Sequence, residues 1–250
     1  MKRLAFAIAV TLLAAATARS QSADQSMQAA APDRAAREKP AAKVQELADA
    51  PLSLSVKTKW ATPDQEMLEV YFTVTNVGSR PVRAYAVRVA RGVETGEGGG
   101  CFFNNIEKAG KILQPNQSIG QSTWRPVPAS DADTPVELTL DFIEFADGTV
   151  WGADGCQTAE RLGGLRAGAR AAKAHFKKKL AEKGIDALVK RLYVDDPALA
   201  PPEGHSDAWK AGFRGAINTY RERIRQANVE GGLPQVEDTL QRPFDTTDNQ

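Results

Sequence analysis

Residues 136–156 read VELTLDFIEFADGTVWGADGC, and this stretch predicts a strand, a tight turn, a returning strand and a cysteine. Apolar and polar residues alternate through its first half, as they do in a strand that has one buried face. The residues expected to face inward are Val136, Leu138, Leu140 and Phe142, and those expected to face outward are Glu137, Thr139 and Asp141. The Asp147-Gly148 pair predicts a two-residue hairpin turn, because both central residues of that turn need positive φ.

Short alternating segments also fill the chain upstream, from residue 52 onward, with turn residues between them. About seven short strands within about 100 residues favour a β-sandwich. The strand at residues 81–89 has two competing inward sets, which are Val82, Ala84 and Ala86, or Tyr85, Val87 and Val89. A β-bulge in this strand would reconcile the two sets.

After Cys156 the apolar residues recur every three to four positions, which predicts an amphipathic helix. Its apolar stripe consists of Ala159, Leu162, Leu165, Ala169, Ala172, Phe176 and Leu180. Gly163, Gly164 and Gly168 each weaken this helix by about 1 kcal/mol relative to Ala, and they allow close packing on the sheet. We expect the stripe to dock either on a later helix or on the sandwich face near Trp151.

Gly184 predicts the end of that helix, and a short second helix should follow it. Ser206 predicts the start of a third helix, which should end near Gly231, Gly232 and Pro234. The apolar stripe of the third helix is Trp209, Phe213, Ile217, Tyr220 and Ile224. The predicted fold class is therefore α+β, with an antiparallel β-sandwich over residues 51–156 and a C-terminal helical region over residues 157–229.

The N-terminus predicts a secretory signal peptide over residues 1–18. Lys2 and Arg3 precede a short apolar run, and Ala16-Thr17-Ala18 fits the small-residue cleavage pattern. The apolar run is shorter than the roughly 20 residues that span a bilayer, so we expect an exported, periplasmic or extracellular protein without a transmembrane segment in its mature chain. Residues 19–50 predict a disordered linker with one weak helical turn near residues 44–47, and residues 230–250 predict a disordered acidic tail.

The chain has two cysteines, Cys101 and Cys156. Export to an oxidising compartment favours a disulfide between them. The alternative is a reactive thiol, which needs a basic neighbour such as a histidine to lower its pKa. The two histidines, His175 and His205, both fall in the predicted helical region.

Three segments carry a resemblance to a known family. They are VYFTVTN at residues 70–76, RPV at 80–82 and LQPNQS at 113–118. Together they resemble the small immunoglobulin-like sandwiches of bacterial envelope proteins, and FxLYD-type modules in particular. The resemblance covers residues 52–151 and implies an immunoglobulin-like fold. The family implies no catalytic residues.

The chain carries 32 Lys and Arg against 31 Asp and Glu, so its net charge of +1 indicates neither nucleic acid nor a membrane surface as partner. Residues 157–193 are locally basic, with ten Lys or Arg and three Asp or Glu. The candidate residues for binding an anionic partner are Arg166, Arg170, Lys173, Lys177, Lys178, Lys179 and Lys183. The alternative is that this helix docks on the acidic sheet domain. Nucleic acid is not expected, because aromatic residues are not interleaved with these charges.

No motif for catalysis, a cofactor or a metal emerges from the rest of the chain. The glycine-rich residues 96–100 lack the Lys-Ser or Lys-Thr of a phosphate loop, and two histidines do not make an ordinary zinc site. Trp124 and Trp151 are candidates either for an aromatic ligand platform or for the sandwich core. The expected function is a non-enzymatic exported module that mediates protein interaction in the cell envelope. The alternative is a protein that binds an anionic envelope component, a lipid headgroup or polymer, through the basic helix.

Overall fold

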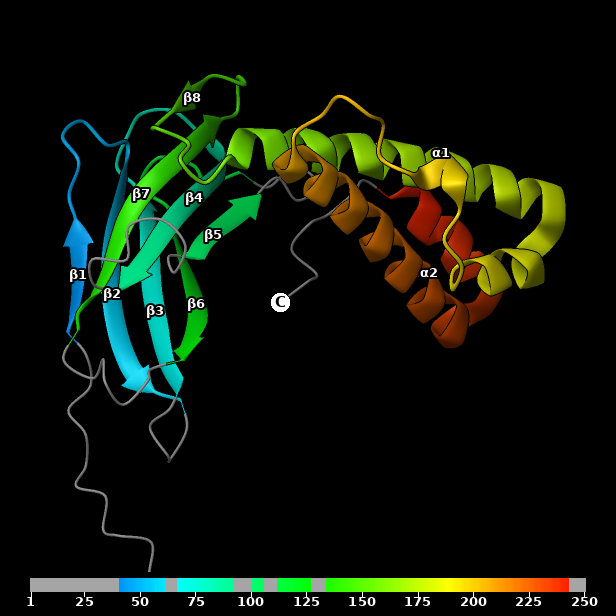
Figure 1. Ribbon diagram of the computed structural model, residues 1–250, viewed down its shortest axis with the longest axis horizontal. Coiled ribbons are helices and arrows are strands. Elements are labelled where there is room, and N and C mark those ends of the chain that lie inside the picture. Colours follow the sequence, from blue (N-terminus) through cyan, green and yellow to red (C-terminus); the bar gives the residue numbers. More distant parts are fainter. Residues whose placement is uncertain (1–40, 62–66, 92–99, 106–111, 127–133, 243–250) are drawn as a thin grey trace, which may run out of the picture. The chain divides into compact units, whose positions relative to one another are not determined.

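The computed structural model describes residues 41–61, 67–91, 100–105, 112–126 and 134–242. All of them belong to one compact unit, Glu38–Gln250. Their fold is α+β, with two sheets of mostly antiparallel strands followed by two long helices (Figure 1). The predicted signal peptide, most of the predicted linker, residues 96–99 of the glycine-rich segment and the end of the predicted tail lie outside the described residues.

The two sheets form the predicted sandwich. Sheet A has the strand order β1-β7-β4-β5, with β8 also paired to β7, and sheet B has the order β2-β3-β6. The strands are β1 (Ala42–Gln45), β2 (Leu52–Trp60), β3 (Met67–Asn76), β4 (Val82–Arg91), β5 (Gly100–Asn105), β6 (Ser118–Pro126), β7 (Val136–Phe145) and β8 (Val150–Trp151). Buried side chains of both sheets, including Phe72 and Leu138, meet in one core cluster between them.

Strand β7 contains a bulge at Asp141. On either side of it, Val87 of β4 pairs with Leu140 and Ala86 pairs with Phe142, so that Asp141 has no counterpart on β4. An extra residue in one strand moves all later side chains to the opposite face. The bulge therefore divides β7 into two halves with opposite alternation.

The two halves of β7 bury different side chains in the core. Leu140 lies in the core between the sheets, and beyond the bulge Ile143 and Phe145 take over that position. Phe142 instead points to the outer face of sheet A, where it packs with Leu162. The predicted inward set is thus confirmed as far as Leu140 and is wrong at Phe142.

Both competing sets of β4 are buried and, apart from Val82, they lie on opposite faces of sheet A. Those in the core between the sheets are Val82, Tyr85, Val87 and Val89. Those on the outer face are Ala84 and Ala86. The predicted bulge is confirmed, since the pairing of β4 with β7 shifts register between Val82 and Ala84.

The hairpin between β7 and β8 differs from the prediction by one residue. The N–H of Phe145 donates to the carbonyl of Thr149, and the N–H of Gly148 donates back to Phe145, both at 2.9 Å. Of the loop residues, only Gly148 has positive φ, at 84°. This is a three-residue loop that ends on a left-handed glycine, not the predicted two-residue turn.

Strand β1 lies within the segment predicted to be a disordered linker. It pairs in parallel with β7, and Val44 is the partner of Leu138. The segment has too few apolar residues to predict a strand by itself. It is ordered because the edge of β7 supplies hydrogen-bond partners, and no helical turn forms at residues 44–47.

The helical region contains α1 (Thr158–Arg191), the short 3₁₀ helix η2 (Pro197–Leu199) and α2 (Asp207–Gln241). Gly184 interrupts α1 with a φ of 73°, at the predicted stop. Gly232 interrupts α2 with a φ of 63°, but the helix then resumes and buries Val236 and Leu240. The helical region therefore extends to Gln241, whereas the prediction placed its end at residue 229.

Glycines allow α1 and α2 to cross at close range. A Cβ on Gly164 would overlap the carbonyl oxygen of Trp209, and a Cβ on Gly168 would overlap that of Phe213. From the other side, a Cβ on Gly212 would overlap the carbonyl oxygen of Arg161. The predicted close packing is thus present, but its partner is α2 and not the sheet.

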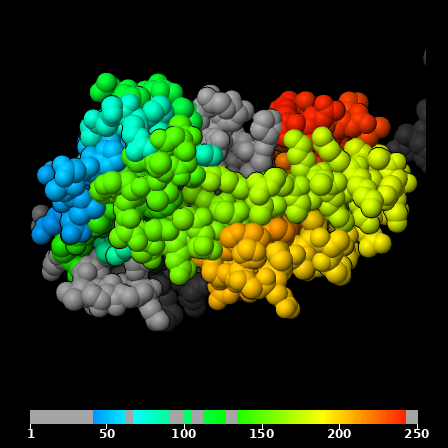
Figure 2. All heavy atoms as spheres, turned by 90° about the horizontal axis from the view of Figure 1, so that it is seen from above, coloured from blue at the N-terminus to red at the C-terminus, as the bar shows by residue number. Residues whose placement is uncertain are grey.

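The apolar stripe of α1 docks on both of the partners that were considered. Leu162, near the start of the helix, packs on Phe142 at the outer face of sheet A. Leu165 and Phe176, further along, belong to the core shared with α2. Figure 2 shows the yellow-green α1 with the orange start of α2 on one side and its red end on the other.

Candidate functional site

A disulfide ties the start of α1 to sheet A. Cys101 on β5 is bonded to Cys156, with 6.0 Å between their Cα atoms. The carboxylate of Asp141 accepts hydrogen bonds from the backbone N–H groups of Gly155 at 3.2 Å and Cys156 at 2.9 Å. It also forms an ion pair with Arg88 at 2.6 Å. The bulge residue therefore holds the segment that leads into the helix, and the bonded sulfurs are not available as nucleophiles.

Arg166, a candidate for binding an anionic partner, is already paired. Its two terminal nitrogens donate to the carboxylate oxygens of Glu144 at 3.0 and 2.8 Å. The Glu144 side chain is only 10% exposed, and Arg83 lies 3.6 Å from it. Arg166 therefore stabilises the contact between α1 and sheet A.

Lys173 is also engaged within the protein. Its ammonium donates to the carbonyl oxygens of Gln241 at 2.9 Å and Arg242 at 3.0 Å. These carbonyls lie at the C-terminal end of α2, where the helix dipole favours a cation. Burial, and secondly the charge of Lys177, lower the pKa of Lys173.

The remaining basic candidates form a smaller surface than the sequence predicted. Arg170, Lys177 and Lys183 are exposed and make no ion pair with any residue that the structure describes. Lys178 lies 3.8 Å from Glu182, one helical turn further on. Lys179 is only partly exposed. Arg170 and Lys177 are seven residues apart, so they share one face of the helix.

The outer face of sheet B is a second candidate surface. The outward side chains of β2, β3 and β6 are mostly hydroxyls and charged groups, and two aromatic residues stand among them. Tyr71 is 45% exposed and Trp124 is 59% exposed. The ring of Tyr71 lies over Gly120, where a Cβ would overlap it. Trp151, the other predicted member of a platform, instead packs against the core.

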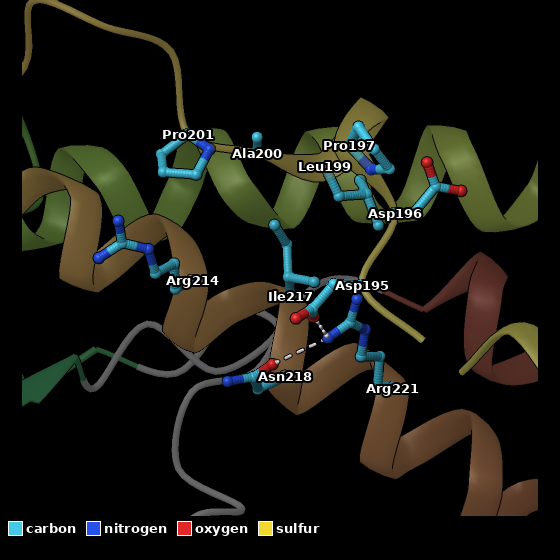
Figure 3. Close-up of a pocket in the computed structure, with 10 residues that line it drawn as sticks. All are labelled: Asp195, Asp196, Pro197, Leu199, Ala200, Pro201, Arg214, Ile217, Asn218 and Arg221. Atoms are coloured by element: carbon cyan, nitrogen blue, oxygen red, sulfur yellow. Dashed lines mark hydrogen bonds and ion pairs between the residues drawn. The ribbon is translucent and has the colours of Figure 1, made fainter. Parts of the chain in front are cut away.

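A pocket of about 330 Å³ lies between α2 and the segment that carries η2 (Figure 3). Arg214, Ile217, Asn218 and Arg221 line it from one face of α2. Its other wall consists of Asp195, Asp196, Pro197, Leu199, Ala200 and Pro201. Five of the ten lining residues are apolar and five are polar or charged.

Some charged side chains around this pocket form ion pairs within the protein, and Arg214 does not with any described residue. Arg221 donates to Asp195 at 3.1 Å and to the carbonyl of Val194 at 3.2 Å. Asp196 lies 3.2 Å from the Nε2 atom of His175, and burial is the main cause that lowers the pKa of this histidine. Arg214 is exposed and has no ion-pair partner among the described residues.

Sequence reasoning did not single out the pocket residues. The signal that could have found them is the spacing of Arg214, Ile217, Asn218 and Arg221, which places them on one helical face. The proline-rich segment at residues 195–202 would have to face them, and the sequence does not show that contact.

Among the described residues, no group of three or more His, Cys, Asp or Glu side chains is arranged to hold a metal ion. No helix in that part of the chain combines the length and apolar character needed to cross a membrane.

The chain is thus an α+β protein with a two-sheet sandwich and a C-terminal helical region. No protein-family model matches it, and no curated protein matches it. A solved structure described as the putative ApaA protein from Bordetella pertussis is 19% identical, with 40% of this chain and 84% of that chain covered and a TM-score of 0.28. Another structural genomics target is 12% identical, covering 40% of this chain and 79% of that chain, with a TM-score of 0.26.

Proposed function

We propose that the protein is a non-enzymatic, exported binding module of the cell envelope, and that the outer face of sheet B is its contact surface. The helices pack on the outer face of the other sheet, through Leu162 and Phe142. The outward residues of sheet B remain exposed, among them Tyr71 and Trp124. The predicted signal peptide supports an envelope location.

The observation that carries this proposal is the exposure of Trp124 and Tyr71 on one face of sheet B. Exposed tryptophan and tyrosine side chains supply large contact areas at low entropic cost and are enriched at binding hot spots. Ser122 is the cross-strand partner of Tyr71, Ser53 and Ser55 lie on the same face along β2, and their hydroxyl groups can make hydrogen bonds with a partner. Lys59 and Glu69 form an ion pair on the same face at 3.0 Å.

The test is capture of a partner from an envelope extract by the immobilised protein without residues 1–18. The Trp124→Ser and Tyr71→Ser variants should each lose the captured protein by at least about tenfold, as hot-spot substitutions do. Val150→Ser is the matched control, since Val150 is 61% exposed but belongs to β8 of sheet A. Undiminished capture by the Trp124→Ser, Tyr71→Ser double variant would overturn the proposal.

A second candidate function is binding of an anionic surface by α1. The exposed Arg170, Lys177 and Lys178 favour it, and each basic residue near an anionic membrane contributes about 1 kcal/mol. Sedimentation with vesicles of anionic lipid, compared with neutral lipid, tests this function. Arg170→Glu and Lys177→Glu should abolish binding, while Lys43→Glu on β1 should not. Equal binding by all variants would exclude α1 as the surface.

A further inference from the structure

The pocket beside η2 has the exposed Arg214 at one end and the ion pair of Asp195 with Arg221 at the other. Figure 3 shows Arg214 and Ile217 on α2 and Leu199 on the facing segment that carries η2. Arg214 and Arg221 are seven residues apart on α2, and at about 1.5 Å per residue the pocket floor between them is roughly 10 Å long. This arrangement suits an elongated ligand with opposite charges at its two ends.

At the Arg214 end, two donors lie one helical turn apart. Asn218 accepts a weak hydrogen bond from Arg221 at 3.5 Å through its side-chain oxygen. Its amide nitrogen therefore points to the side where Arg214 lies (Figure 3). Arg214 has all its donors available within the part of the chain that the structure describes. A carboxylate suits this pair, because a guanidinium binds it through two parallel hydrogen bonds.

At the other end, the Asp195 side chain is fully exposed, and its Oδ1 atom lies 3.1 Å from Arg221. The second oxygen can accept a hydrogen bond from an ammonium group. Asp196 differs, because it points away from the pocket in Figure 3 and pairs with His175. The apolar middle is lined by Ile217 and Leu199, which are both buried in the helical core.

We propose that this pocket binds short peptides with free termini, with the C-terminal carboxylate on Arg214 and Asn218 and the N-terminal ammonium on Asp195. Three extended residues, at about 3.3–3.6 Å each, span the roughly 10 Å of the pocket floor. An apolar central side chain lies against Ile217 and Leu199. The site is on α2, so it is independent of the function proposed for sheet B.

Calorimetric titration of the protein without residues 1–18 tests this site with the tripeptide Ala-Leu-Ala, its C-terminal amide and its N-acetyl form. The free tripeptide should bind saturably, and amidation or Arg214→Ala should weaken binding by at least about tenfold, as loss of a charged hydrogen bond does. N-acetylation and Asp195→Asn should each weaken it as well. Arg214→Lys should restore part of the affinity that Arg214→Ala loses, because it keeps the charge without the two-pronged geometry.

The control is Arg191→Ala, which removes an exposed arginine of α1 outside the pocket. It should leave the affinity unchanged, and the melting temperatures of all variants should match because the substituted side chains are on the surface. Absence of saturable binding up to millimolar peptide would overturn the proposal, as would equal affinity of Arg214→Ala. If the N-acetyl form binds as tightly as the free peptide, the ligand is an apolar monoacid and the peptide assignment is wrong.

Discussion

Arg166 of α1 and Glu144 of β7 join the helical region to the sandwich through two parallel hydrogen bonds, at 3.0 and 2.8 Å. Glu144 faces α1 because the bulge at Asp141 turns the second half of β7 around. Together with the packing of Leu162 on Phe142 and the disulfide, this ion pair fixes the first turns of α1 on sheet A.

Replacing Arg166 with Ala should lower the free energy of unfolding by about 1.5–3 kcal/mol, the range for hydrogen bonds to charged groups. Among the residues that the structure describes, the nearly buried Glu144 would retain Arg83, at 3.6 Å. Urea denaturation measures the loss. The Arg166→Leu, Glu144→Leu double variant should be more stable than either single variant, because it removes both members of the Arg166–Glu144 pair. Additive losses in that cycle would mean that the two side chains are not coupled.

Gly164→Ala should destabilise the helical region, because the new Cβ would overlap the carbonyl oxygen of Trp209 and force α1 and α2 apart. We expect a loss of about 1–3 kcal/mol, as for other overpacked cores. The matched control is Gly215→Ala in α2, where no atom lies within 4 Å of the added Cβ. That variant should gain up to about 1 kcal/mol from helix propensity. Calorimetric melting of both variants should show shifts of opposite sign.

The Cys101→Ser, Cys156→Ser double variant should unfold more easily than the oxidised protein by about 4 kcal/mol, the loop-closure value for a sequence separation of 55 residues. Alkylation of the native protein should find no free thiol until a reductant is added. Reduced wild-type protein should match the double variant. Two alkylated thiols under oxidising conditions would contradict the bond.

The pKa of His175 is lowered mainly by burial, against the opposing attraction of Asp196 and together with repulsion from Lys178 and Lys179. The unfolded chain therefore takes up a proton near pH 6.5 while the folded protein does not. This contribution to stability is present above about pH 6.5 and is lost as the pH falls below it. Denaturation at several pH values should show this slope, and His175→Gln should reduce it. His205→Gln, at an exposed site, should leave it in place.

The sequence predicted the features that depend on local pattern. The strands of the sandwich, the Ser206 cap at the start of α2 and the interruption of α1 at Gly184 follow from alternation, capping and glycine chemistry. The pairing of Cys101 with Cys156 followed from counting two cysteines in a chain expected to be exported.

Features that depend on distant partners could not be predicted in the same way. The order of β1 depends on the edge of β7, about 90 residues further along the chain, through pairs such as Val44 with Leu138. Arg166 and Lys173 belong to one run of basic residues, and nothing local shows that they meet Glu144 and the end of α2. The pocket residues were missed for the same reason, since its two walls meet only in the folded chain.

The bulge at Asp141 determines which face of sheet A each later side chain of β7 takes. Deletion of Asp141 would remove one residue of 250, yet it would turn Glu144 toward the interior of the sandwich and Ile143 toward α1. The length of this strand is thus as strongly constrained as the identity of its residues. Natural variation in relatives of this chain should therefore include substitutions along β7 far more readily than insertions or deletions.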